Sequence, residues 1–138
     1  MAIKHIVFDW DGTLVDTHAF IFEAFDAVFA QLGLPPIPHD KVALICRTVP
    51  HHQAFAHTWG NRGEEARRLY YGYFAVHHLD SLTMMPGAEE FLEYCCRNKI
   101  KCYICSNKKH DFLLSEIEKL GLSGCFTGIV GAGYAPKD

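Results

Sequence analysis

The chain has 138 residues, which suits one domain or a small domain carrying an insertion, and 49% of them are hydrophobic, so a sizeable core can form. Its net charge is −3 and its lysines and arginines form no runs, so composition indicates neither a nucleic-acid partner nor an anionic membrane surface. No apolar run approaches the ~20 residues of a membrane helix and the first residues lack the pattern of a signal peptide, so we expect a cytoplasmic protein without a membrane partner.

The six cysteines allow disulfide or zinc interpretations. Cys102 and Cys105 lie three residues apart in an extended apolar run, where they face opposite sides and cannot easily share a metal. The others are two neighbours on a predicted helix and two isolated residues: Cys95, Cys96, Cys46 and Cys125. We interpret all six as reduced packing thiols.

The first predicted element is a buried strand at residues 6–8, which runs directly into Asp9, Trp10, Asp11 and Gly12. An extended backbone sends alternate residues to the same side, so Asp9 and Asp11 should point together and Trp10 away. If the strand is parallel and buried on both faces, its carboxyl end opens onto a ligand crevice. Two carboxylates there form a hard oxygen site suited to Mg²⁺.

Two other interpretations of this loop fit less well. Asp-x-Asp-Gly can be an ordinary turn, since both residue types favour turns, but a turn explains one acid rather than two. The residue types of Thr13 and Leu14 do not match those at the same positions of a calcium loop, and a calcium loop follows a helix rather than a strand. Gly12 can adopt a backbone conformation closed to other residues, and Thr13 can hydrogen-bond locally.

A block without any convincing strand follows, from about residue 17 to residue 82. Apolar residues at helical spacing precede Gly33, and the phenylalanines among them are interpreted as core rather than as a cofactor site. Proline-rich residues then break the chain. Further helices are predicted at residues 40–46, 50–59 and 62–79.

The α/β pattern resumes after Met85-Pro86-Gly87, with a helix at 88–97, a strand at 100–105 and a third strand at 126–130. A right-handed strand–helix–strand crossover makes parallel neighbours, so Ser106 and Asn107 should lie beside Asp9. Ser106 could instead cap a helix at 108–120. Either interpretation allows phosphate near that helix N-terminus.

Residues 8–17 resemble the first motif of the haloacid dehalogenase-like hydrolases, in the phosphoglycolate phosphatase-like branch, whose pattern is F-D-x-D-G-T-L-x-D-[ST]. The resemblance implies that Asp9 attacks phosphorus to form an aspartyl-phosphate and that Asp11 acts as general acid and then general base. Both acids would hold Mg²⁺. Ser106 resembles the second motif, which binds a phosphoryl oxygen, and Thr13 and Asn107 are predicted as further phosphate contacts.

The order of the elements resembles a family core interrupted by a cap. The implied fold is α/β, with a Rossmann-like parallel sheet core at 1–16 and 83–138 and an all-helical cap at 17–82. A cap can close over the site and select the leaving group. Arg47 and His51, with Thr48 and His52 beside them, are its candidate specificity residues, although each alone is more often an ordinary surface residue.

The family's third motif, a lysine, and its fourth, an acidic loop, are not clearly present, because Lys137 is followed by Asp138 rather than proline. We therefore expect a core that is incomplete at its C-terminal end. Such a chain would have no cation to offset the repulsion between the nucleophile and the phosphate, and would be a weak or inactive phosphatase. Its unpaired sheet edge would favour self-association.

The leading functional prediction is a Mg²⁺-dependent phosphatase acting on a small phosphorylated metabolite. A sugar-phosphate mutase of the same family is an alternative, since it needs the same acid pair. A non-catalytic, truncated binding protein is another. A phospho-acceptor receiver module fits less well, because its acceptor aspartate lies on a later strand and no helical block follows its first strand.

Overall fold

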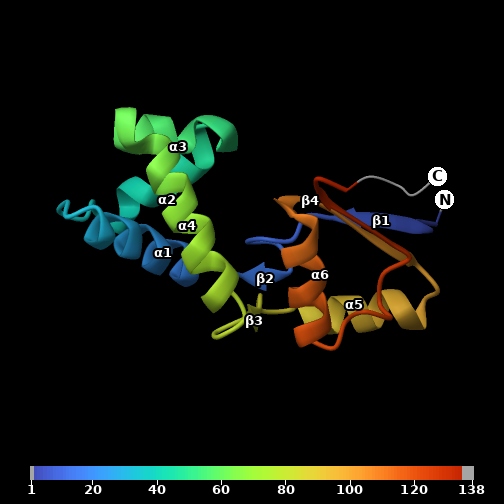
Figure 1. Ribbon diagram of the computed structural model, residues 1–138. Coiled ribbons are helices and arrows are strands. Elements are labelled where there is room, and N and C mark those ends of the chain that lie inside the picture. Colours follow the sequence, from blue (N-terminus) through green and yellow to red (C-terminus); the bar gives the residue numbers. More distant parts are fainter. Residues whose placement is uncertain (1, 135–138) are drawn as a thin grey trace. The chain divides into compact units, whose positions relative to one another are not determined.

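The computed structural model describes residues 2–134, which form two compact units (Figure 1). One unit joins the N-terminal segment as far as Thr17 to the segment that begins at Leu79, and the other is His18–His78. In the described part of the chain, no helix combines the length and apolar character needed to cross a lipid bilayer. Lys137 and Asp138, where the sequence leaves the third motif open, lie outside the described residues.

The first unit contains a three-stranded parallel sheet in the order β1-β4-β5. Its strands are β1 (His5–Phe8), β4 (Lys101–Lys109) and β5 (Gly128–Ala132). In the β1–β4 register, Phe8 pairs with Ile104, so the carboxyl end of β1 lies beside the middle of β4. This confirms the predicted parallel neighbours and the α/β class, with β5 beginning two residues later than expected.

Helices α5 (Ala88–Arg97) and α6 (His110–Lys119) cover one face of this sheet (Figure 1). Both helices present apolar residues at helical spacing, which gives each a stripe to bury. The core beneath them also takes in the loop after β1. Its buried residues are Trp10, Leu14, Val15, Ala88, Leu92, Cys95, Cys102, Ile104, Leu113 and Ile117.

The opposite face of the sheet is exposed, so the expectation of a β1 buried on both faces is wrong for the described residues. Val7 is 66% exposed, whereas Ile6 and Phe8 pack against the core. On the outer face, His5 Nδ1 lies 3.2 Å from the Tyr103 hydroxyl. An unbroken apolar run therefore occurs here on a strand with one buried face.

β4 is longer than predicted. It runs through Ser106 and Asn107 to Lys109, with an irregularity in its pairing to β5 between Cys105 and Lys109. Helix α6 therefore starts at His110, and no side chain caps its N-terminus. The alternative role of Ser106 as cap of a helix at 108–120 is wrong.

A short antiparallel ribbon was not predicted. β2 (Val15–Asp16) pairs with β3 (Thr83–Met84), and Met85 N donates to Leu14 O over 2.9 Å just beyond the pair. Two residues per strand are too few to produce an alternating pattern in the sequence. The ribbon ties together the two segments between which the helical unit is inserted.

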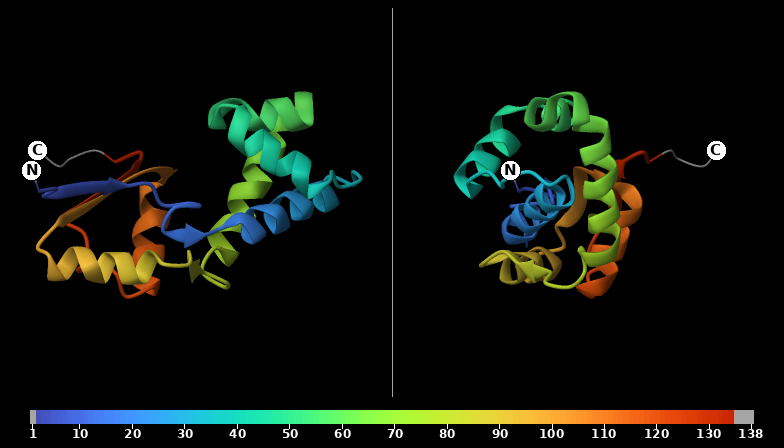
Figure 2. Two further views of the ribbon diagram at one scale, coloured as in Figure 1. Left: turned by 180° about the vertical axis from the view of Figure 1, so that it is seen from behind. Right: turned by 60° about the vertical axis from the view of Figure 1, so that its left-hand side comes forward.

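The second unit is all helical. It contains α1 (His18–Gln31), α2 (His39–Thr48), α3 (His51–Trp59), the 3₁₀ turn η1 (Gly60–Arg62) and α4 (Gly63–His77). Helix α4 lies against both α1 and α3 (Figure 2). Gly33 follows α1 in a left-handed conformation with φ +67°, and Leu34 N donates to Phe29 O over 2.9 Å, so the predicted stop is confirmed.

The core of the helical unit is aromatic. Trp59 lies 5.1 Å from Phe25 and 5.0 Å from Phe29 between ring centroids, and Phe55 lies 5.4 Å from Tyr70. All five side chains are buried, which confirms the phenylalanine stripe as core. Trp59 Nε1 is buried without a hydrogen-bond partner among the described residues.

The cysteines of the described chain carry free thiols. Cys102 is buried, and burial, the Cys95 thiol and then the nearby Cys125 raise its pKa to about 11. Cys102 is therefore a protonated packing thiol at neutral pH. Cys125 is not isolated, as the sequence suggested, because the fold brings it near Cys96 and Cys102.

Candidate active site

The loop after β1 is a compact turn organised by the backbone of Trp10. Its carbonyl oxygen accepts hydrogen bonds from the N–H groups of Thr13 (3.1 Å), Leu14 (3.1 Å) and Val15 (3.3 Å). Gly12 has φ +73°, and its N–H donates to Val15 O over 2.8 Å. The predicted special conformation at Gly12 is confirmed, since the tight turn uses a region that residues with a side chain rarely adopt.

Trp10 points into the core, as the alternation predicted. Its side chain is fully buried, its ring meets Phe126 edge-on at 6.5 Å, and its Nε1–H donates to Glu116 Oε2 over 2.7 Å. Asp9, in contrast, is exposed, and its Oδ1 accepts from the Trp10 N–H over 2.7 Å. Trp10 thus anchors the loop in the core, while the side chain of Asp9 stays accessible.

Asp11 is paired with a lysine that the sequence did not single out. Lys108 Nζ lies 2.6 Å from Asp11 Oδ1 and 2.6 Å from Glu116 Oε2. The side chains of Lys108 and Glu116 are 5% and 1% exposed, whereas that of Asp11 is 32% exposed. A buried cation thus lies against Asp11, which the sequence did not predict.

The sequence did not predict this cluster of Asp11, Lys108 and Glu116, for two reasons. The sequence predicts that a helix starts at Lys108, whereas β4 continues to Lys109 and Lys108 lies within the strand. One partner, Asp11, lies 97 residues earlier, and the other, Glu116, lies eight residues later on α6. The local sign of burial at position 116 is its helical spacing from Leu113 in α6 and from Leu120 at its C-cap, which both belong to the apolar stripe.

The irregularity in β4 places Lys108. Cys105 pairs with Val130 but Lys109 pairs with Ala132, so four steps along β4 match two along β5. Within this bulge, the Lys108 N–H donates to Ser106 Oγ over 3.1 Å. A Cβ on Gly131 would lie 2.8 Å from Lys108 O and 2.7 Å from His110 Cα, so only glycine fits against the bulge.

The three predicted phosphate contacts lie at the ends of neighbouring strands. Ser106 is half-buried in the bulge, Asn107 beside it is exposed, and Thr13 is exposed in the turn after β1. Because β1 and β4 are parallel neighbours, their carboxyl ends lie at the same edge of the sheet. The phosphate-binding roles of these residues remain predictions.

Arg47 and His51 belong to the helical unit. Arg47 lies in the last turn of α2, one residue beyond the helix predicted at 40–46, and His51 begins α3. Both are exposed, and the His51 ring meets Phe55 edge-on at 6.2 Å. Their role in specificity remains a prediction.

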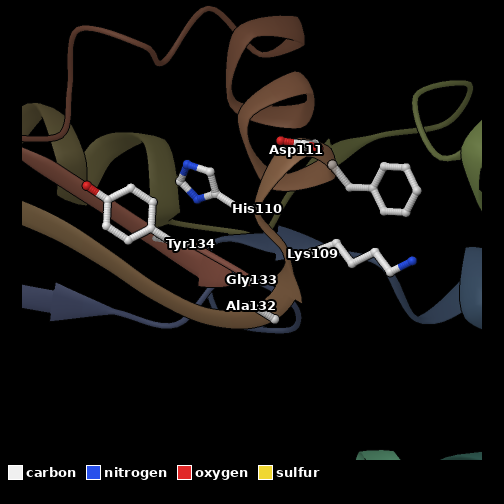
Figure 3. A pocket seen from close by; sticks show the side chains of 7 residues that line it. Lys109, His110, Asp111, Ala132, Gly133 and Tyr134 are labelled. Atoms are coloured by element: carbon white, nitrogen blue, oxygen red, sulfur yellow. The ribbon is translucent and has the colours of Figure 1, made fainter. Parts of the chain in front are cut away.

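A pocket opens at the β4–α6 junction and the end of β5 (Figure 3). There, Gly131 N donates to His110 Nδ1 over 3.2 Å, and the His110 and Tyr134 rings lie 4.8 Å apart. Figure 3 shows Lys109 extending away from these two rings. None of the predicted site residues lines this pocket, whose lining residues are Lys109, His110, Asp111, Phe112, Ala132, Gly133 and Tyr134.

The oxygen donors at the end of β1 fit Mg²⁺ better than a softer metal. Asp9 is exposed and Asp11 partly so, and both offer carboxylate oxygens. Within residues 2–134, no group of three or more histidine, cysteine or acidic side chains is arranged to hold a metal. This donor set suits an ion that is usually held by one or two carboxylates, with water and substrate phosphate completing its coordination.

Comparison with known proteins gives a consistent family. Residues 6–136 match the family described as haloacid dehalogenase-like hydrolase. A phosphoglycolate phosphatase of Caulobacter vibrioides is 30% identical over 138 residues, covering 95% of this chain and 58% of that protein. One from Chromobacterium violaceum is 28% identical, covering 98% of this chain and 64% of that protein.

Solved structures agree on the fold. A haloacid dehalogenase-like family hydrolase from Streptococcus pneumoniae superposes with a TM-score of 0.85 at 26% identity, covering 95% of this chain and 62% of that one. The chain therefore spans a little over half the length of the relatives that it matches.

Proposed function

The chain belongs to the haloacid dehalogenase-like hydrolase family, and we propose that it carries the nucleophile and the acid–base residue of a Mg²⁺-dependent phosphatase. The proposed substrate is a small phosphorylated metabolite of the phosphoglycolate type, because relatives that match 95% or more of the chain are phosphoglycolate phosphatases. The cytoplasm stays the predicted compartment.

The placement of Asp9 and Asp11 supports the proposal most strongly. Both follow a parallel strand at its carboxyl end, the position at which ligands bind in open α/β sheets. The turn at Gly12 keeps the backbone close to that edge. Asp9 is exposed and the carboxylate of Asp11 remains reachable, so a phosphate ester can approach both.

In the proposed reaction, an Asp9 carboxylate oxygen attacks phosphorus and the bond between phosphorus and the ester oxygen breaks. Asp11 gives its proton to the departing oxygen, and the product is an alcohol and an aspartyl-phosphate. Asp11 then takes a proton from water as it attacks phosphorus, which releases inorganic phosphate and restores Asp9. Mg²⁺ held by Asp9 and Asp11 would offset the negative charge of the phosphoryl group.

The remaining predicted residues have supporting roles in this proposal. Ser106, Asn107 and Thr13 would donate hydrogen bonds to phosphoryl oxygens from the adjacent strand ends. The helical unit, within the predicted range 17–82, would act as the cap, with Arg47 and His51 selecting the leaving group.

Phosphate release from a panel of small phosphomonoesters, with and without Mg²⁺, tests the proposal. Asp9→Asn should abolish release, because an amide is a poor nucleophile and a weaker metal ligand. Asp40→Asn, which removes an exposed carboxylate from α2, is the matched control and should leave turnover unchanged. Turnover that survives in Asp9→Asn would place the nucleophile elsewhere.

The same panel separates the phosphatase from the mutase. A phosphatase releases inorganic phosphate from the ester, whereas a mutase returns an isomeric ester. Conversion of a hexose phosphate into its isomer without phosphate release would favour the mutase.

A further inference from the structure

We propose that Lys108 is a positioning residue for Asp11, holding the carboxylate at the orientation in which it transfers a proton. The inference rests on the proposed role of Asp11 as general acid and base. It assigns a function to a side chain that neither the sequence pattern nor the first motif includes.

The first step is the unusual burial of Lys108. Lysine is among the residue types least often buried, and a buried ammonium needs charged or hydrogen-bonding partners. Lys108 is 5% exposed and has two carboxylate partners, each at 2.6 Å. Short contacts of this kind, between an ammonium and a carboxylate, are the stronger class of hydrogen bond.

The second step is that Lys108 is itself held from several sides. Glu116 is 1% exposed on α6, and its Oε2 also accepts from Trp10 Nε1 over 2.7 Å. On the other side, the backbone of Lys108 donates to Ser106 Oγ and packs against Gly131. The ammonium is thus held by Glu116 of α6, and the backbone that carries it is held by the bulge and by β5.

The third step is the effect on Asp11. Its Oδ1 is bound by Lys108, while the side chain keeps 32% of its surface exposed. One oxygen is therefore held from inside the unit and the group can still be reached from outside. A general acid must lie within hydrogen-bond reach of the leaving oxygen, and small misplacements in an active site are costly in rate.

The competing explanation is structural. Lys108 could serve only to neutralise the buried charge of Glu116. The two explanations differ for a double variant, Lys108→Met with Glu116→Gln. It removes both buried charges and keeps an acceptor for Trp10, so a purely structural deficit is relieved while Asp11 still lacks its ammonium.

The test uses the 138-residue chain and two readouts. The first is the set of χ1 rotamers that Asp11 populates, measured by three-bond NMR couplings. The second is the single-turnover rate of leaving-group release, which reports the first half-reaction, for p-nitrophenyl phosphate, whose leaving group needs no proton, and for a small alkyl phosphate, whose leaving group does. Lys109→Met, which removes the neighbouring exposed lysine, is the control.

We expect one dominant Asp11 rotamer in the wild-type and Lys109→Met chains and averaging in the double variant. In the double variant the rate of leaving-group release should fall on the order of 100-fold for the alkyl ester and change little for the activated ester, whereas hydrolysis of the aspartyl-phosphate should slow for both. The single variant Lys108→Met should show the same selectivity if it folds.

An unchanged Asp11 rotamer in the folded double variant, or equal losses in leaving-group release from the two esters, would overturn the inference. If the wild-type chain hydrolyses neither ester, the proposed function fails. In that case the rotamer measurement alone decides whether Lys108 positions Asp11.

Discussion

At the scale of single residues, Trp10 shows how a core side chain prepares a reactive loop. Its carbonyl oxygen accepts the hydrogen bonds of the turn, and its backbone N–H donates to Asp9. Its indole N–H donates to Glu116, which also binds Lys108. The sequence predicted only that Trp10 would face away from the acids. Its partner could not be predicted, because Glu116 lies 106 residues later and hydrogen bonds across such a distance leave no periodic signal.

Trp10→Phe should lower the free energy of unfolding by about 1.5–3 kcal/mol, because it keeps an aromatic ring but removes a buried hydrogen bond to a charged acceptor. The matched control is Trp59→Phe, since Trp59 Nε1 is equally buried but has no hydrogen-bond partner among the described residues. Urea unfolding followed by circular dichroism measures both. Equal losses in the two variants would show that the Trp10–Glu116 bond contributes nothing.

At the scale of elements, the long regular pieces were predictable and the irregular ones were not. The helix at 88–97 and the stop at Gly33 follow from apolar spacing and from glycine. The β2–β3 ribbon and the extension of β4 to Lys109 do not, because two-residue strands carry no alternation and the polar run Ser106–Lys109 resembles a helix start. Because the extension of β4 was not predicted, the pairing of Lys108 with Asp11 was not predicted either.

Gly131→Ala tests whether the bulge in β4 depends on close packing. The new methyl carbon would lie 2.7 Å from His110 Cα, and backbone on both sides must move to admit it. We expect a loss of about 1–3 kcal/mol in the free energy of unfolding and slower ester hydrolysis, because Lys108 shifts with the bulge.

Gly124→Ala is the control for this change, since a Cβ there meets nothing within 4 Å. The urea midpoint and the rate of phosphate release are the measurements. A Gly131→Ala chain as stable and as active as Gly124→Ala would mean that the junction tolerates the extra carbon.

At the scale of the whole molecule, the sheet leaves apolar surface open among the described residues. β1 pairs only with β4 there, Val7 is 66% exposed and Ile3 is 69% exposed. Unpaired strand edges and exposed apolar side chains promote association between chains. The predicted self-association would therefore use the β1 side of the sheet.

Val7→Lys should reduce the fraction of dimer in sedimentation velocity experiments on the 138-residue chain, because a charge on a strand edge opposes edge-to-edge pairing. Val76→Lys is matched in chemistry and in exposure, at 70%, but lies on α4. Val76→Lys should leave the dimer fraction unchanged. A wild-type chain that stays monomeric at high concentration, or equal effects of the two variants, would contradict the prediction.

The identity of the nucleophile is the central claim, and chemical trapping tests it most directly. The Asp11→Asn chain is mixed with p-nitrophenyl phosphate and Mg²⁺, quenched, and reduced with borohydride, which converts an aspartyl-phosphate into homoserine. Without Asp11 as base the phosphoenzyme should persist, so peptide mass spectrometry should find homoserine at position 9 and at no other aspartate. Homoserine at another aspartate, or release of p-nitrophenol with Asp9 unmodified, would contradict the account.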